Sequence, residues 1–287
     1  SIISNLAESY RRIRNTARFL LANLNGFVPE RDLIPHSELS EVDQYVLLRL
    51  ASIIDDAKAS FDAYEFHLPM FKIHQFCDNE LSAFYIDISK EKLYADREDS
   101  HPRRCARSVM WEVLSSLTSM IAPVLCFTAE EIWQEMRGMD PSLPESVHLS
   151  EWPDVSREGM DAGVTPRWDR VMEARGAVTR ALETARSQGI IGHALDASVW
   201  AVFGSDYADI DYVTESEWET ITIVSGFKKS ASPLEADVTY EDALTGITVG
   251  VGRSRDAKCP RCWKHRPEVG EKEVCDRCAD ALEHMRG

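Results

Sequence analysis

Four cysteines near the C-terminus have the spacing of a metal site. Cys259 and Cys262 form one Cys-x2-Cys pair, and after twelve residues Cys275 and Cys278 form a second. A structural zinc ion takes four soft ligands in a tetrahedron, and a two-residue gap lets both thiolates of one pair reach the same ion. Two such pairs without a βαβ pattern favour a metal over a disulfide or a redox dithiol. His265 remains open as a replacement for one thiolate.

The stretch around these cysteines is basic, although the protein is acidic. Residues 253–287 contain nine Lys and Arg against seven Asp and Glu, whereas the chain has 32 against 48. Trp263 directly follows the first cysteine pair, and the cations near it include Lys258, Arg261, Arg266 and Arg277. Cations beside an aromatic ring suit a partner with phosphates and unpaired bases. The alternative is that Trp263 covers the zinc ion and the charges only solvate the module.

A row of arginines near the N-terminus is the second basic feature. Residues 4–25 show apolar side chains spaced by three and four, which predicts an amphipathic helix. Arg11, Arg14 and Arg18 have the same spacing and therefore form a row beside the apolar stripe. Such a row is often only the solvated face of a helix. A phosphate contact and a solvated face are therefore the two alternative interpretations of this row.

The helical pattern continues to residue 138. Further helices are predicted from about 40 to 61, from 64 to 94, from 102 to 121, and from a capping box at Thr128 and Glu131 onwards. These segments are consistent with one another in period and in their end signals. Residues 1–138 are therefore predicted to form an α-helical bundle.

Residues 139–252 are predicted to form a linker and a small α/β junction domain. One helix takes Thr165 as its cap and Pro166 as its first residue, and short β-rich runs follow at 198–203, 221–224 and 247–251. Residues 140–245 contain 20 Asp and Glu against 8 Lys and Arg, which does not suit RNA binding by this part alone. The predicted fold class is thus mainly α, with a junction domain that spaces the bundle from a zinc finger at residues 253–287.

The composition limits where the protein works and what it binds. With 287 residues the chain has room for two or three domains, and no apolar run has the eighteen or so residues of a membrane span. The chain opens directly in a helical pattern without a signal peptide, which suggests a fragment of something longer. A net charge of −16 opposes indiscriminate nucleic-acid binding, so any RNA contact must use local basic patches.

No pattern of catalytic residues stands out in the sequence. It contains neither a Gly-x-x-x-x-Gly-Lys-Ser/Thr loop nor a Gly-x-Gly-x-x-Gly turn, and it has no Gly-x-Ser-x-Gly elbow and no His-Glu-x-x-His pair. A zinc ion with four thiolates has no open coordination position for a substrate. We therefore assign no catalytic residue and expect this chain alone to be inactive.

Several stretches together resemble the C-terminal portion of bacterial isoleucyl-tRNA synthetases. The resemblance covers nearly the whole chain and includes Tyr10-Arg-Arg-Ile-Arg-Asn-Thr-Ala-Arg-Phe19, Phe127-Thr-Ala-Glu-Glu-Ile-Trp133, Val147-His-Leu-Ser-Glu-Trp-Pro153 and Cys259-Pro-Arg-Cys-Trp263 with Cys275-Asp-Arg-Cys278. The bundle pieces are also similar to the valyl and leucyl enzymes, whereas the four-cysteine finger points to isoleucine. The His-Ile-Gly-His and Lys-Met-Ser-Lys-Ser signatures of the family's catalytic domain are absent here.

The resemblance implies an anticodon-binding bundle, a junction domain and a zinc finger that together dock the anticodon stem-loop of the isoleucine tRNA. It implies one structural zinc ion, and ATP only in the full-length ligase, which joins isoleucine to that tRNA. It further implies a cytoplasmic monomer without membrane contact, in which the chain's other partner is its own catalytic domain. It favours Arg11, Arg14 and Arg18 for contacts with phosphates, and Trp263 together with Arg261 for contacts with the anticodon loop.

Two competing interpretations remain beside tRNA binding. A zinc-stapled scaffold or protein-interaction module without RNA specificity accounts for the same cysteines. A redox protein that uses its Cys-x-x-Cys pairs predicts reactive thiols in the presence of zinc. A steep salt dependence of RNA binding distinguishes tRNA binding from the scaffold interpretation.

Overall fold

The computed structural model describes residues 2–285 and divides them into two compact units. Of these residues, 2–93 and 98–165 form the first unit, and 94–97 and 166–285 form the second. The last two residues of the predicted zinc module, 286 and 287, lie outside the described residues. No helix among the described residues is both long and apolar enough to cross a membrane.

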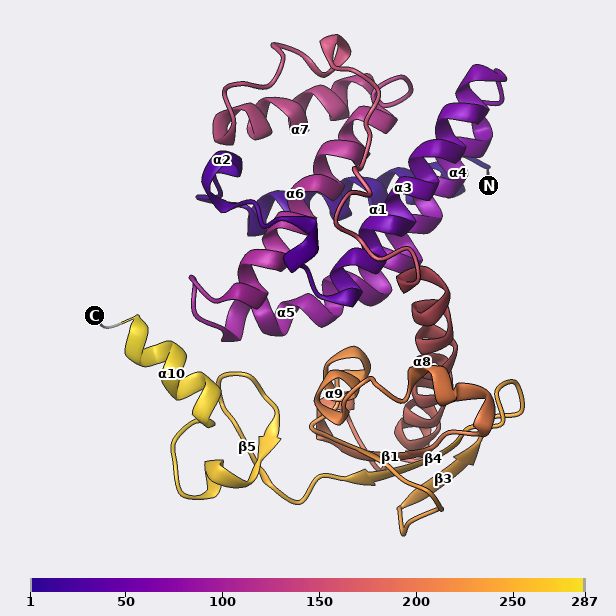
Figure 1. The fold of residues 1–287 in the computed structure, drawn as a ribbon, viewed down its shortest axis with the longest axis vertical. Coiled ribbons are helices and arrows are strands. Elements are labelled where there is room, and N and C mark those ends of the chain that lie inside the picture. The colour runs from indigo at the N-terminus through magenta and orange to yellow at the C-terminus, as the bar shows by residue number, and fades with distance from the viewer. Residues whose placement is uncertain (1, 286–287) are drawn as a thin grey trace. The chain divides into compact units, whose positions relative to one another are not determined.

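The first unit is a helical bundle (Figure 1). Its helices are α1 (Ile2–Asn23), α2 (Pro29–Asp32), α3 (Glu41–Asp62), α4 (His67–Gln75), α5 (Ile86–Ala95), α6 (His101–Ile121) and α7 (Cys126–Met139), with the short helices η1 (His36–Glu38) and η3 (Val147–Leu149). Helix α6 contacts α1, α3 and α7, and its side chains are buried along most of its length. The apolar stripe of α1 is buried from Ile13 onwards, whereas Leu6 and Tyr10 are exposed.

Two details of the bundle differ from the sequence predictions. The predicted helix 64–94 consists of α4, the π-helical segment η2 (Phe76–Tyr85) and α5, because hydrophobic spacing does not reveal an i→i+5 bonding pattern. The capping box at Thr128 is wrong. Helix α7 begins two residues earlier, so Thr128 lies inside the helix and its hydroxyl meets that of Tyr10 at 3.2 Å.

The second unit combines helices with a four-stranded sheet and the cysteine-rich module. Its elements are α8 (Val164–Ser187), η4 (Ala194–Asp196), β1 (Ala197–Val202), η5 (Ser205–Ile210), α9 (Glu215–Thr222), β2 (Gly226–Lys229), β3 (Val238–Glu241), β4 (Thr248–Arg253), β5 (Ala257–Lys258), β6 (His265–Arg266), η6 (Pro267–Gly270) and α10 (Asp276–His284). The sheet has the order β2-β1-β4-β3, with β1 and β2 parallel and the other pairs antiparallel. The predicted fold class, mainly α with a small α/β part and a zinc finger, is confirmed.

Helices α8 and α9 supply the apolar layer on one face of this sheet (Figure 1). Trp218 of α9 is fully buried and stacks between Phe203 and Phe227, with ring centroids 5.3 Å from each. The predicted strand 221–224 is wrong, because these residues end α9 and form its C-cap, where Ile223 adopts a left-handed conformation. Thr165 is not a cap either, since α8 already includes Val164.

Candidate metal centre and nucleic-acid interface

The four predicted zinc ligands converge at one point in the second unit. Cys259 and Cys262 follow β5, Cys275 is the N-cap of α10, and Cys278 lies in its first turn. All four sulfur atoms lie within 4.8 Å of one another, and the Sγ atoms of Cys262 and Cys275 are 3.7 Å apart. Zinc–sulfur bonds of about 2.3 Å in a tetrahedron place sulfurs about 3.8 Å apart. The donor set therefore fits one structural zinc ion.

The surroundings of the sulfurs show why the cluster needs a cation. Cys259, Cys275 and Cys278 are buried among apolar side chains such as Val269 and Val274. Burial raises the pKa of Cys259, but hydrogen bonds from the backbone amides of Cys262, Cys275 and Arg261 outweigh it and bring the pKa to about 6. For Cys275 burial prevails, and its pKa is raised to about 11. A zinc ion supplies the positive charge that lets all four become thiolates.

His265 does not belong to the metal cluster. Its Nδ1 donates to the backbone carbonyl of Asp256 at 2.7 Å, and its Nε2 lies 3.4 Å from the carboxylate of Asp196. Both ring nitrogens thus face protein oxygens, while the four sulfurs form a complete set. The alternative in which His265 replaces a thiolate is not supported by this geometry.

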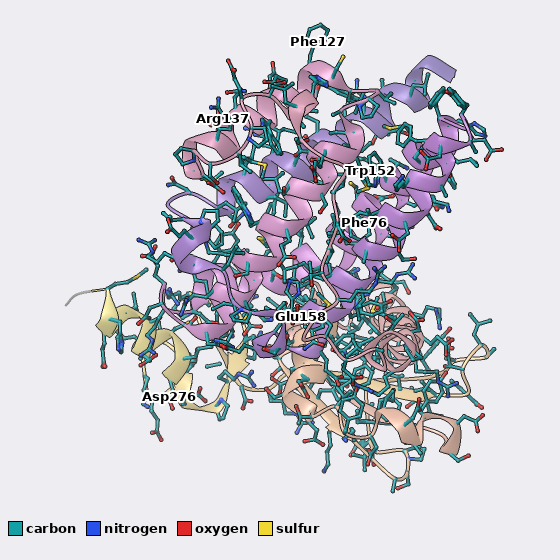
Figure 2. The ribbon with its side chains drawn as sticks, turned by 45° about the horizontal axis from the view of Figure 1, so that its top comes forward. Phe76, Phe127, Arg137, Trp152, Glu158 and Asp276 are labelled. Carbon is teal, nitrogen blue, oxygen red and sulfur yellow. The ribbon has the colours of Figure 1, made fainter. Side chains whose placement is uncertain are left out.

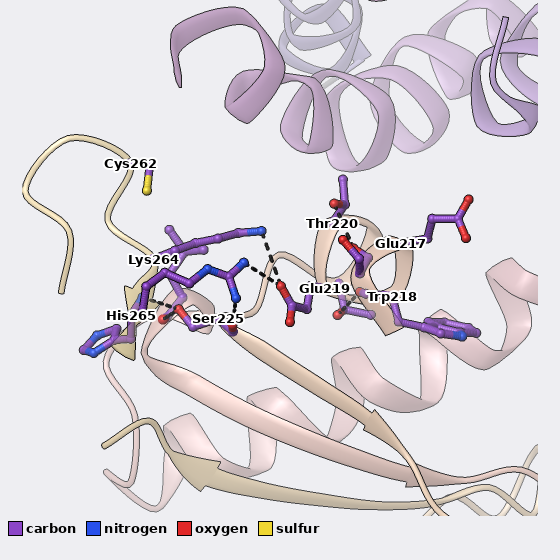
Figure 3. Close-up of polar contacts among 12 residues, drawn as sticks. Glu217, Trp218, Glu219, Thr220, Ser225, Cys262, Lys264 and His265 are labelled. Atoms are coloured by element: carbon purple, nitrogen blue, oxygen red, sulfur yellow. Dashed lines mark hydrogen bonds and ion pairs between the residues drawn. The ribbon is translucent and has the colours of Figure 1, made fainter. Parts of the chain in front are cut away.

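Three cations of the zinc module point to carboxylates of the sheet region. Lys258 donates to Asp196 at 3.1 Å, and Arg266 donates to Glu219 at 2.6 Å and to the carbonyl of Ser225 at 3.0 Å. The buried Lys264 also lies 4.0 Å from Glu219 (Figure 3). These pairs orient the module on the junction domain of the same unit.

The carboxylate of Asp196 is stabilised in its charged form by these contacts. Burial raises its pKa, but hydrogen bonds from Lys258, from the backbone of His193 and from His265 outweigh burial and hold the pKa at about 2. Asp196 thereby binds residues of the zinc module at neutral pH.

Arg261 and Arg277 contact the segment 94–97. This segment comprises the last two residues of α5 and the two residues after them, and it belongs to the second unit. The guanidinium of Arg261 donates to the backbone carbonyls of Ala95 and Tyr94, and that of Arg277 donates to the carboxylate of Asp96. Both cations were predicted to bind RNA, and the structure gives them protein partners. Sequence spacing carries no sign of these pairs, since they join residues more than 160 positions apart.

Trp263 differs from the cations around it because its ring is exposed to solvent. Its side chain is 61% exposed, although it directly follows a zinc ligand. Its backbone has φ of 66°, in the left-handed region that non-glycine residues rarely adopt, and its amide donates to the carbonyl of Cys259 at 2.9 Å. The zinc-binding turn therefore holds an aromatic ring out towards solvent rather than over the metal.

The arginine row of α1 faces helix α7 within the first unit. Arg11, Arg14 and Arg18 are all exposed, and Arg11 lies 3.5 Å from Glu8. Arg14 and Arg18 line a groove of about 630 Å³ together with Phe127 and with carboxylates of α7. Glu130, one of these carboxylates, accepts hydrogen bonds from Ser146 and from the backbone of Val147.

The exposure of Phe127 was not predicted from the sequence. It is 86% exposed and projects from the first turn of α7 (Figure 2). A phenylalanine near the start of a helix is typical of a core residue in a sequence, so only the structure shows that its ring borders the groove with Arg14 and Arg18.

Comparisons with known proteins agree with this arrangement. Residues 43–201 match the family described as anticodon-binding domain of tRNA ligase, and residues 257–281 match the zinc finger found in FPG and IleRS. The chain is 40% identical to an isoleucine–tRNA ligase of Geobacter sulfurreducens and 38% identical to one of Natranaerobius thermophilus, over 98% of this chain in both cases. It spans only 30% and 31% of these relatives.

Proposed function

Because this chain belongs to the family of anticodon-binding domains of tRNA ligases, we propose that it binds the anticodon stem-loop of an isoleucine tRNA as part of a longer isoleucine–tRNA ligase. Its relatives of that name are about three times as long, since the chain spans about 31% of their length. The ATP-dependent joining of isoleucine to tRNA is assigned to the rest of such a ligase, and no catalytic residue is assigned here. We further propose a cytoplasmic monomer.

The proposed division of labour follows the predicted domains. Residues 1–138 and the zinc module at 253–287 carry the RNA contacts, and residues 139–252 place them. The exposed ring of Trp263 is the observation that carries the proposal, because unpaired loop bases stack on aromatic side chains. Arg14 and Arg18 are the proposed phosphate contacts, together with Arg11 at the edge of the row, and they position the RNA rather than read its sequence.

The other cations that were predicted to bind RNA are proposed to position the zinc module rather than to contact RNA directly. Lys258, Arg266, Arg261 and Arg277 already engage protein oxygens. Their proposed role is to fix the direction in which the module presents Trp263, so their removal changes RNA binding through the position of that ring.

Binding of the zinc-loaded chain to the anticodon stem-loop of an isoleucine tRNA and to an anticodon-swapped stem-loop tests the proposal. Stacking on an aromatic side chain is worth about 1–3 kcal/mol per base, so Trp263→Ala should weaken binding of the first RNA by roughly 5- to 150-fold. Zinc content, measured by atomic absorption, should stay at one ion per chain.

Tyr64→Ala is the matched control. Like Trp263, Tyr64 is an exposed aromatic residue with a positive φ: its side chain is 81% exposed and its φ is 61°. It lies in the turn after α3, far along the chain from the zinc ligands. This variant should bind RNA like the original chain. Equal binding by Trp263→Ala would contradict the stacking role. Failure of the original chain to bind either RNA, with zinc and fold intact, would favour the scaffold interpretation.

A further inference from the structure

The two faces of the four-stranded sheet differ in what covers them. Val199 and Val251 are paired in the register and are buried on the face that carries α8 and α9. Trp200, the next residue of β1, pairs with Lys228 of β2 and with Gly250 of β4, so these three share the opposite face. That face carries connecting segments rather than these two helices (Figure 1).

Trp200 forms the floor of this second face. A Cβ atom on Gly250 would lie 1.9 Å from Cε2 of the Trp200 indole, so the ring lies directly on the bare backbone of β4. The side chain is 6% exposed, and its Nε1 is out of solvent with no hydrogen-bond partner among the described residues. The indole N–H thus lies against the backbone of β4, where a ligand in the groove does not reach it.

A groove of about 420 Å³ lies next to this floor. Residues that line it include Ser198, Trp200, Lys228, Arg253 and Arg255. The ammonium of Lys228 and the guanidinium groups of Arg253 and Arg255 make no ion pair or hydrogen bond with other described residues. These three cations are thus available to a ligand, unlike Lys258, Arg261, Arg266 and Arg277, which contact protein oxygens.

Carboxylates also line the groove, and they limit the class of ligand that the groove can bind. Asp237 already accepts a hydrogen bond from the backbone amide of Arg253 at 2.9 Å. Glu235 and Asp256 add two further carboxylates beside the three cations. A purely anionic ligand gains from the cations but is repelled by the acids. A chain of phosphates and hydroxyl-bearing riboses uses both, because a 2′-hydroxyl donates to a carboxylate.

We propose that this groove binds the sugar–phosphate backbone of an RNA strand, with Lys228, Arg253 and Arg255 on phosphates and Glu235 and Asp256 on ribose hydroxyls. The proposal rests on the function proposed above and adds a contact surface formed by the four-stranded sheet and the residues directly after β4. Because the floor is a buried ring rather than an exposed one, the groove contacts the backbone and adds no base specificity.

Combined substitution Lys228→Ala, Arg253→Ala and Arg255→Ala in the zinc-loaded chain tests the phosphate contacts. Affinity for the isoleucine anticodon stem-loop and for its anticodon-swapped version should fall by the same factor, at least tenfold. The slope of log affinity against log salt should become shallower by about one for each phosphate whose cation is removed.

Lys229→Ala is the control for general charge effects. Lys229 is the next residue of β2 and is bound to Asp211 at 3.0 Å, outside the groove. It should leave the slope and the affinity nearly unchanged. An unchanged slope in the triple variant, with the original chain still binding RNA, overturns the groove proposal alone. Absence of RNA binding by the original chain overturns the function proposed above, and this inference with it.

A double variant tests the ribose contacts. Glu235→Gln with Asp256→Asn should reduce the preference for the RNA stem-loop over a DNA stem-loop of the same sequence by at least threefold. An unchanged preference for RNA over DNA would overturn the ribose contacts.

Discussion

At the scale of single residues, Trp263 combines exposure with backbone strain. A left-handed conformation costs a non-glycine residue about 1–2 kcal/mol, and an exposed ring gains little from burial in return. The zinc ligands Cys259 and Cys262 precede Trp263, whose amide donates to the carbonyl of Cys259 and so holds the turn in this conformation. Stacking of an RNA base on the exposed ring would offset the energetic cost of this conformation.

Trp263→Gly should therefore be more stable than Trp263→Ala by about 1 kcal/mol. Glycine adopts positive φ freely, although its larger conformational entropy in the unfolded chain reduces the gain. Denaturant unfolding of the two zinc-loaded variants measures the difference. Both variants should bind the isoleucine stem-loop equally weakly, since both lack the ring. A less stable glycine variant would show that the turn is not strained.

Asp242 gives a residue-scale prediction about pH. It accepts hydrogen bonds from Arg180 at 2.6 and 2.9 Å, and these bonds hold its pKa at about 2 although burial raises it. Its folded-state pKa is below the unfolded value, so its stabilising effect is complete above about pH 4 and disappears as the pH falls to about 2. Because Arg180 is partly exposed, the effect is on the order of 1–2 kcal/mol.

Asp242→Asn tests this dependence. Its unfolding free energy should be lower than that of the original chain at pH 7, and the two should converge between pH 4 and pH 2. Chemical denaturation at several pH values measures the two curves. Asp206→Asn serves as the control, because it removes the same charge from an exposed residue of the same unit, and its curve should run parallel to the original. A constant difference for Asp242→Asn down to pH 2 would assign its effect to geometry rather than to charge.

Spacing was enough to predict the metal ligands but not the partners of the cations. Four cysteines in two pairs are constrained by local geometry around one ion, so the sequence contains the whole signal. Lys258 and Asp196 are 62 positions apart, and Arg277 and Asp96 are 181 apart. Such pairs depend on how the chain folds back on itself, which charge patterns in a sequence do not encode.

At the scale of elements, long amphipathic helices were predictable and short elements were not. The helices α3, α6 and α8 follow their hydrophobic period closely. The run Ile221–Val224 looks like a strand because it is rich in β-branched residues, yet tertiary packing makes it the end of α9. The strand β3 was missed because its four residues, Val238–Glu241, are too few to show alternation.

The close approach of β1 and β4 yields an element-scale prediction. Gly250→Ala places a methyl group inside the volume of the Trp200 ring and should lower stability by about 1–3 kcal/mol, because the ring must move. Gly204→Ala is the control in the same unit, since a Cβ there meets nothing within 4 Å. Thermal unfolding compares the two. Equal melting temperatures would show that the indole adapts without cost.

At the scale of the whole molecule, zinc should support one part of the chain and not the other. Chelation leaves four closely spaced thiols in a small module, whereas the first unit contains none of the ligands. Hydrogen exchange should show loss of protection in residues 257–284 and unchanged protection in α3 and α6. RNA affinity should fall at least tenfold, or about 1.4 kcal/mol.

Single cysteine substitutions provide the matched comparison for chelation. Cys275→Ser should behave like the chelated chain, whereas Cys126→Ser, which changes an exposed cysteine outside the cluster, should keep its zinc and its protection. Loss of protection in the first unit after chelation would show that its folding also depends on the metal.

The contact between Trp200 and Gly250 also restricts the order in which these two positions can change over generations. A side chain at position 250 lowers stability as long as Trp200 is present, because the ring occupies the place of that Cβ. A smaller residue at position 200 meanwhile leaves a void that selection disfavours. Substitution at either position alone is therefore disfavoured, and we expect changes at the two positions to occur together.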